Sequence, residues 1–218
     1  MRHTILSPFE SLPYFTIEGF RQITGDKVSG AAHARTSLYR WAKAGHIVQL
    51  KNGVYMHRRF YELHHMEQGF SSMVSAILLP QSYLSLEFIL QGRGILTEIT
   101  YPVTAITYKN TRTITNSLGT FAYRHIRLDL YCGFQFAEAY GIPYSQASLA
   151  KALFDYLYLR PLSLAAGLRH SNLAEELRLN LGEFTPADRE EFARVVMASG
   201  VVKMQRILEN LESTVWRP

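Results

Sequence analysis

The chain has 218 residues, of which 47% are hydrophobic and 19% charged, so it can form a packed core and is not a mainly disordered protein. Its net charge of +5 indicates an acidic partner without identifying one. The single cysteine excludes a disulfide-stabilised fold and a four-cysteine zinc site.

The positive charge is concentrated near the N-terminus. Residues 1–66 contain nine Lys or Arg and four Asp or Glu, whereas residues 67–218 contain fourteen of each sign. We therefore expect a basic N-terminal domain (1–66) and a larger, neutral domain (67–218). With no secretory signal and no apolar run approaching the ~20 residues that span a bilayer, we expect a cytoplasmic protein without a membrane partner.

Two helices are predicted at the start of the basic domain. The first occupies residues 16–25, where Thr16 caps its start and Gly25 closes its end in a left-handed conformation. A polar turn at 26–30 separates it from a longer helix at 31–44, which Gly45 ends.

A helical wheel gives the second helix a core face and a polar face. The core face is centred on Leu38 and contains Ala31, Ala34, Trp41, Ala42 and Gly45. The opposite face contains His33, Thr36, Arg40 and Lys43, with Arg35 and Tyr39 on one flank.

A β-hairpin follows this helix. Two apolar, β-branched runs at 46–51 and 54–57 flank the pair Asn52-Gly53, which is typical of a tight type I′ turn. Helix, turn, helix and hairpin in this order predict a winged helix-turn-helix.

Such a domain binds double-stranded DNA by placing its second helix in the major groove. Arg40 is suited to guanine, while Thr36 and His33 can reach bases or phosphates. Arg35, Lys43 and Lys51 are expected to neutralise phosphates, and the hairpin tip at Lys51-Asn52 to touch the flanking backbone or minor groove. Alternatively, the polar face is only solvated and the domain contacts protein.

The neutral domain is predicted to mix helices and strands and to end in helices, which makes the whole chain α+β. Helices are expected at 59–66, 70–79 and 85–91, from Ser145 or Ser148 to Arg160, and at 173–179, 186–199 and 201–212. Strands are expected at 104–108, 112–116, 119–126, 134–140 and 142–144.

No catalytic, cofactor or metal site is predicted. Gly92-Arg93-Gly94 lacks the Lys-Ser/Thr of a phosphate-binding loop, and the adjacent pair His64-His65 has no supporting cluster of acids or thiols. Cys132 is expected to be buried, and Lys151 and Asp155 to pair on a helix surface. We therefore expect a protein that is not an enzyme; a nuclease or nucleotidyltransferase has no acidic constellation to support it.

Four segments, in order along residues 15–160, together resemble the AbiEi antitoxin family of type IV abortive-infection toxin–antitoxin systems. They are Leu38–Ile47 running into Leu50–Tyr55, Ser82–Glu87 with Gly94–Glu98, Gly119–Ile126 with Gly133-Phe134, and Ala147–Tyr158. Two departures stand out: Asn52 replaces the usual arginine of the hairpin, and Leu149-Ala150 replaces Pro-Glu in the last segment.

The resemblance implies a DNA-binding winged helix that represses its own operon at inverted repeats. It also implies that the C-terminal domain counters a cognate nucleotidyltransferase-like toxin. The alternative is a solitary winged-helix regulator that senses a small ligand in its C-terminal domain, where Tyr83, Phe88, Tyr101 and Tyr108 either line a pocket or pack in the core.

Overall fold

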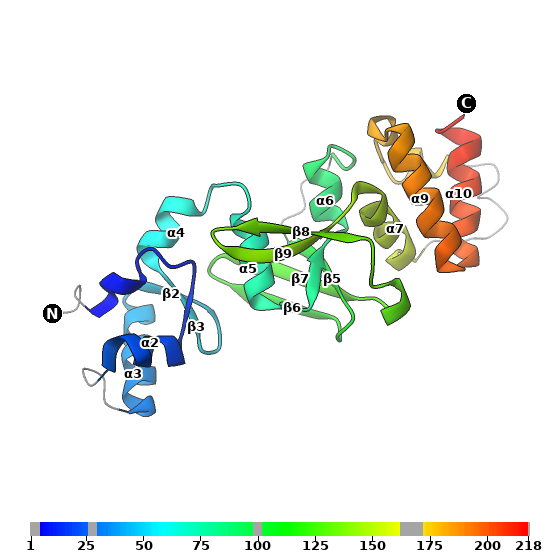
Figure 1. Cartoon of the computed structure of the whole chain (residues 1–218). Coiled ribbons are helices and arrows are strands. Elements are labelled where there is room, and N and C mark those ends of the chain that lie inside the picture. The colour runs from blue at the N-terminus through cyan, green and yellow to red at the C-terminus, as the bar shows by residue number, and fades with distance from the viewer. Residues whose placement is uncertain (1–4, 26–29, 98–101, 162–171, 218) are drawn as a thin grey trace.

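The computed structural model describes residues 5–25, 30–97, 102–161 and 172–217. It is an α+β protein with one small and one larger sheet, as expected (Figure 1). The small sheet belongs to the N-terminal domain, at the left in Figure 1, and the larger one to the centre of the molecule.

After two short elements that the sequence does not predict, the N-terminal domain has the expected order of two helices and a hairpin. A short 3-10 helix, η1 (Ser7–Phe9), precedes β1 (Phe15–Thr16), α2 (Ile17–Thr24), α3 (Ala31–Lys43), β2 (Ile47–Lys51) and β3 (Val54–His57). The strands form an antiparallel sheet in the order β1-β3-β2. Thr16 caps α2 by accepting a hydrogen bond from the Gly19 amide at 3.0 Å, and Gly25 ends the helix with a φ of 53°, as predicted.

The core of this domain is aromatic. Phe9, Phe15 and Phe20 pack together beneath α3, which buries Ala34 and Leu38 against them. Trp41 is half-buried and meets Phe20 edge-on, with ring centroids 5.7 Å apart. The predicted core face is too long: Ala31 and Gly45 are exposed because they lie at the two ends of the helix, beyond the part that the core covers.

The hairpin turn differs from the prediction. A type I′ turn needs a positive φ at both central residues, but of the pair Asn52-Gly53 only Gly53 has one, at 77°. The strand register also shifts between Gln49 and Lys51, which places Lys51 opposite Val54. The pairing of Lys51 with Val54 leaves Asn52 and Gly53 as a two-residue turn, as predicted, but the turn is not of type I′ and an irregular register precedes it.

The second domain surrounds a six-stranded sheet with strand order β6-β7-β5-β4-β9-β8. Its strands are β4 (Ser82–Leu84), β5 (Val103–Thr107), β6 (Arg112–Asn116), β7 (Gly119–His125), β8 (Phe134–Ala139) and β9 (Ile142–Ala147). Its helices are α5 (Phe70–Leu78), α6 (Glu87–Gly92), η3 (Leu128–Leu130), α7 (Leu149–Leu159), α8 (Leu173–Glu176), η4 (Leu181–Glu183), α9 (Pro186–Ser199) and α10 (Val202–Thr214). They are preceded by α4 (Arg58–His64), which follows the hairpin at the end of the N-terminal domain. The central strand β4 is absent from the sequence prediction because it has only three residues.

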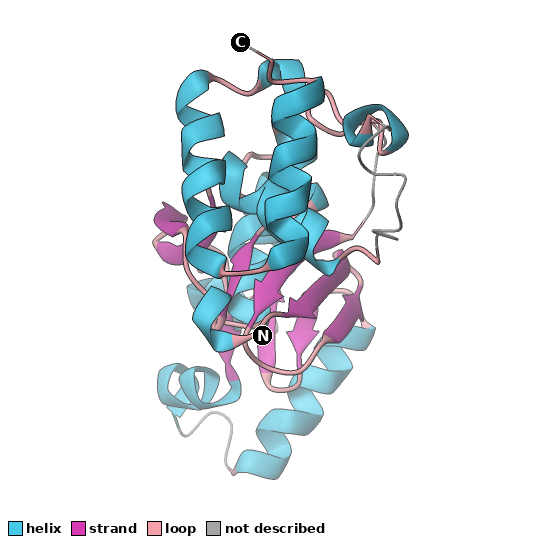
Figure 2. Ribbon diagram, turned by 90° about the vertical axis from the view of Figure 1, so that its right-hand side faces the viewer, coloured by secondary structure: helices cyan, strands magenta, loops and turns pink. Residues whose placement is uncertain are grey.

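Two hydrophobic clusters cover the two faces of this sheet. On one face, α5 packs Met73 and Val74 against Phe121 and Tyr123 of β7. On the other, α6 and α7 cover the sheet, and α9 and α10 pack outside α7 at the C-terminal end (Figures 1 and 2). Ser148 rather than Ser145 caps α7, and its hydroxyl accepts a hydrogen bond from the Lys151 amide.

The two domains share a hydrophobic core. Val48, Leu50, Met56 and Phe60, from the hairpin and α4, belong to the same buried cluster as α5 and β7. The Asn116 side-chain amide, at the β6–β7 turn, donates to the Leu50 carbonyl at 3.0 Å. The hairpin therefore contacts the second domain through buried apolar side chains and through this hydrogen bond.

Candidate nucleic-acid interface

The polar face of α3 is open to solvent. His33, Thr36, Arg40 and Lys43 are all exposed, on the side of the helix opposite to buried Leu38. The structure therefore brings these four predicted residues together on one continuous surface. Figure 1 shows α3 at the outer end of the N-terminal domain, away from the central sheet.

This face carries positive charge that no acid among the described residues pairs with. No Asp or Glu occurs in α3, and neither Arg40 nor Lys43 forms an ion pair with a residue that the structure describes. Both lie in the last turn of α3, where the partial negative charge of the helix C-terminus stabilises a positively charged side chain. The Thr36 hydroxyl donates to the Ala32 carbonyl at 3.0 Å, so its remaining capacity toward a ligand is as an acceptor.

Arg35 and Asn52 line one cavity beside this face. They line a cavity of about 570 Å³ between α2, α3 and the hairpin tip. Glu18, in the first turn of α2, lines the same cavity and is its acidic member. Arg35 and Asn52 therefore extend the polar face of α3 toward the hairpin, next to one negative charge.

Lys51 does not join this surface. Its ammonium donates to the carbonyls of Ile77 and Leu78 at 2.6 and 3.0 Å, at the C-terminal end of α5, and burial lowers its pKa. The prediction that Lys51 neutralises a phosphate is not supported by this placement, because two of its three N–H groups already have acceptors within the protein. No local pattern signals this interaction, since 26 residues separate Lys51 from Ile77.

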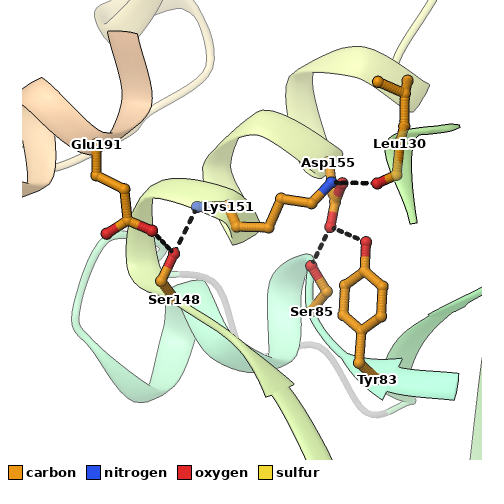
Figure 3. Close-up of polar contacts among 7 residues, drawn as sticks. All are labelled: Tyr83, Ser85, Leu130, Ser148, Lys151, Asp155 and Glu191. Carbon is orange, nitrogen blue, oxygen red and sulfur yellow. Dashed lines mark hydrogen bonds and ion pairs between the residues drawn. The ribbon is translucent and has the colours of Figure 1, made fainter. Parts of the chain in front are cut away.

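Apart from the α3 surface, a cluster of hydrogen-bonded polar side chains lies in the core of the larger domain (Figure 3). The Asp155 carboxylate accepts hydrogen bonds from Lys151 Nζ at 2.5 Å, Ser85 Oγ at 2.8 Å and Tyr83 OH at 3.0 Å. Lys151 Nζ also donates to the Leu130 carbonyl at 3.0 Å. The predicted surface pair of Lys151 and Asp155 is wrong, because both side chains are closed to solvent.

Burial shifts the pKa values of the acidic side chains in this cluster. It raises the pKa of Asp155, against the opposing effect of the Lys151 charge. Burial and the neighbouring carboxylate raise the pKa of the Tyr83 hydroxyl. These side chains bond to one another and are closed to solvent, so the arrangement links β4 and η3 to α7.

Two other expectations for this domain can be compared with the structure. Cys132 is exposed, contrary to the prediction of a buried thiol, because it lies in the loop between η3 and β8. Tyr83 is in the core, and Tyr108 packs edge-on against Tyr131 with centroids 5.0 Å apart, which agrees with the core-packing alternative rather than with a ligand pocket at these two residues. Tyr101 lies outside the described residues.

Within the described part of the chain, no group of three or more His, Cys, Asp or Glu side chains is placed to hold a metal ion. None of the helices there is both long and apolar enough to cross a membrane. The sequence matches no protein-family model, and a search of curated proteins gives no match either.

Proposed function

We propose that the protein is a transcriptional regulator that binds double-stranded DNA through an N-terminal winged helix, with α3 as the recognition helix and β2–β3 as the wing. One observation carries this proposal: the exposed face of α3 holds Arg40 and Lys43, has no acid, and forms no ion pair with any described residue. A DNA duplex supplies the dense negative charge that such a surface lacks.

Each predicted DNA-binding residue has a role in this proposal, except Lys51. Arg40 recognises a base edge, most suitably guanine, and His33 and Thr36 reach bases or phosphates nearby. Lys43 and Arg35 neutralise phosphates, and Asn52 contacts the flanking backbone. No catalytic step and no cofactor are part of this function.

We further propose that the regulator is the antitoxin of a type IV toxin–antitoxin pair, which represses its own operon at inverted repeats. The support is the ordered set of segments that resemble the AbiEi family, which lie on the hairpin, β4, β7 and α7. In this proposal the larger domain counters a nucleotidyltransferase-like toxin. A solitary regulator that responds to a small ligand is the alternative.

DNA binding is tested with a labelled duplex containing the promoter region upstream of the protein's own reading frame. We expect the wild-type protein to bind this duplex, with an affinity that falls steeply as salt rises, because counterions are released. The double variant R40A/K43A should bind at least tenfold more weakly. Its salt dependence should also be shallower, by about 0.9 for each phosphate that is no longer neutralised.

The matched control is R194A/R206A, which removes two exposed positive charges from α9 and α10. It should bind like the wild type if the α3 surface, rather than net charge, is responsible. Equal affinity of R40A/K43A and the wild type would contradict the assignment of α3.

The antitoxin role is tested by co-expression with a nucleotidyltransferase-like protein encoded beside this gene. Growth should be restored by the full chain and also by R40A/K43A, because neutralisation is assigned to the larger domain. Absence of such a neighbour, or no restoration of growth, would favour the solitary regulator.

A further inference from the structure

A groove of about 520 Å³ lies where the hairpin meets the larger domain. Tyr14 and Val54 line it from the N-terminal side, and Ala76 of α5, Phe136 of β8 and Tyr144 of β9 from the other. Its walls are mainly apolar and aromatic, and its volume lies in the range typical of small-molecule sites.

Lys51 is the charged member of this lining. Two of its N–H groups donate to the Ile77 and Leu78 carbonyls, and no described carboxylate pairs with the ammonium. Burial lowers its pKa, and no acidic neighbour among the described residues offsets that effect. The groove therefore presents a partly desolvated positive charge that no described carboxylate balances.

The geometry points to a binding site for a small aromatic anion in this groove. Its carboxylate accepts the remaining N–H of Lys51, and its ring packs against Tyr14, Tyr144 and Phe136. A neutral aromatic molecule fits the same walls but leaves the ammonium without a counter-ion. A cation is disfavoured by the charge of Lys51.

Such a ligand touches both domains at once, since Val54 belongs to the hairpin and Ala76 to α5. Its carboxylate adds a third acceptor to the Lys51 ammonium, whose other two N–H groups already connect the hairpin to the carbonyls of α5. The next expectation rests on the proposed function. A ligand in the groove should change the affinity of the protein for operator DNA, because the hairpin lies beside the recognition helix.

The site is tested by isothermal titration of the full chain with 1-naphthoate and with its neutral analogue 1-naphthamide. We expect naphthoate to bind at least tenfold more tightly, as one charge-assisted hydrogen bond provides. Equal binding of the two compounds, or binding of neither, would overturn the proposal.

Two variants locate the site. K51M removes the charge, and A76F fills the groove from α5; both should abolish the preference for naphthoate. The matched control is K203M, because Lys203 likewise donates to two carbonyls, those of Tyr158 and Arg160, but lies far along the chain in α10. Retention of the preference in K51M, or its loss in K203M, would contradict a site at Lys51.

The effect of the ligand on DNA binding is measured separately, by determining the affinity for the operator duplex with and without naphthoate. We expect the DNA affinity of the wild type to change and that of A76F to stay constant. If the protein binds naphthoate but no DNA, the proposed function fails while the ligand site stands. If it binds DNA but not naphthoate, the ligand site fails alone.

Discussion

Lys151 and Asp155, one turn apart on α7, form an ion pair in which both side chains are closed to solvent. Opposite charges in an apolar core stabilise a fold only when both are present and hydrogen-bonded, and here Ser85, Tyr83 and the Leu130 carbonyl complete the arrangement. This pair holds β4, η3 and α7 together.

K151M should destabilise the protein by about 3–5 kcal/mol at neutral pH, because it leaves the Asp155 carboxylate buried without its partner. Chemical denaturation measures this loss. The double variant K151M/D155L should be more stable than K151M alone. An equal or larger loss in the double variant would show that the pair's charges are not the cause.

The same variant should respond to acid in a defined direction. Burial already raises the pKa of Asp155 above its usual 3.8, and removing Lys151 raises it further. The folded carboxyl then keeps its proton to higher pH than the unfolded chain does, so K151M loses stability as pH rises from about 4. Denaturation of K151M at several pH values between 4 and 8 checks this trend.

K51M should leave the salt dependence of DNA binding unchanged, because the Lys51 ammonium contacts α5 rather than a phosphate. K43M should instead reduce the salt slope by about 0.9. The slopes are measured with one duplex over a range of salt concentrations. A reduced slope for K51M would mean that this residue contacts DNA after all.

Glu67 provides a pH-dependent contact between the domains. Its carboxylate accepts a hydrogen bond from Tyr140 OH at 2.8 Å and pairs with His64 Nδ1 at 2.9 Å, and these bonds lower its pKa below 4.5. The stability it contributes is present above pH 4.5 and is lost as pH falls through the lowered pKa.

The pKa of Glu67 is measured by NMR titration. In Y140F, which removes the largest cause of the shift, it should rise toward the usual value. E67Q should differ from the wild type in stability above pH 4.5 and converge with it as pH falls through the lowered pKa of Glu67. An unchanged pKa in Y140F would mean that Tyr140 does not bond to the carboxylate in solution.

Cys132 should react with a maleimide in the folded protein, because it is exposed. C132S should change the free energy of unfolding by less than about 0.5 kcal/mol, as for other surface substitutions. Mass spectrometry of native and denatured samples distinguishes the outcomes. Labelling only after denaturation would place the thiol in the interior, as the sequence alone predicts.

Local signals predict most helices and strands correctly. Thr16 with Gly25, and Thr185 with Pro186, mark helix ends through short-range capping that depends on neighbouring residues alone. The pattern centred on Leu38 correctly places Arg40 and Lys43 on the exposed face. Such features are encoded within a few residues.

Long-range contacts are not predictable in this way. The sequence assigns Lys51 to DNA because its partners on α5 are distant along the chain. For Lys151 and Asp155, the apolar neighbours on α7 are the local sign of burial, but charge pairing at four-residue spacing is the same on a surface and in a core. Only tertiary packing distinguishes the two.

The shared cluster around Val48, Leu50, Met56 and Phe60 has a consequence for engineering. If the chain were divided after residue 66, the N-terminal fragment would expose to solvent the apolar side chains of the hairpin and α4 that α5 and β7 cover in the full chain. We therefore expect residues 1–66 to fold poorly when they are fused to another protein without the larger domain. A chimera should therefore keep the hairpin together with the larger domain, whose α5 and β7 cover it.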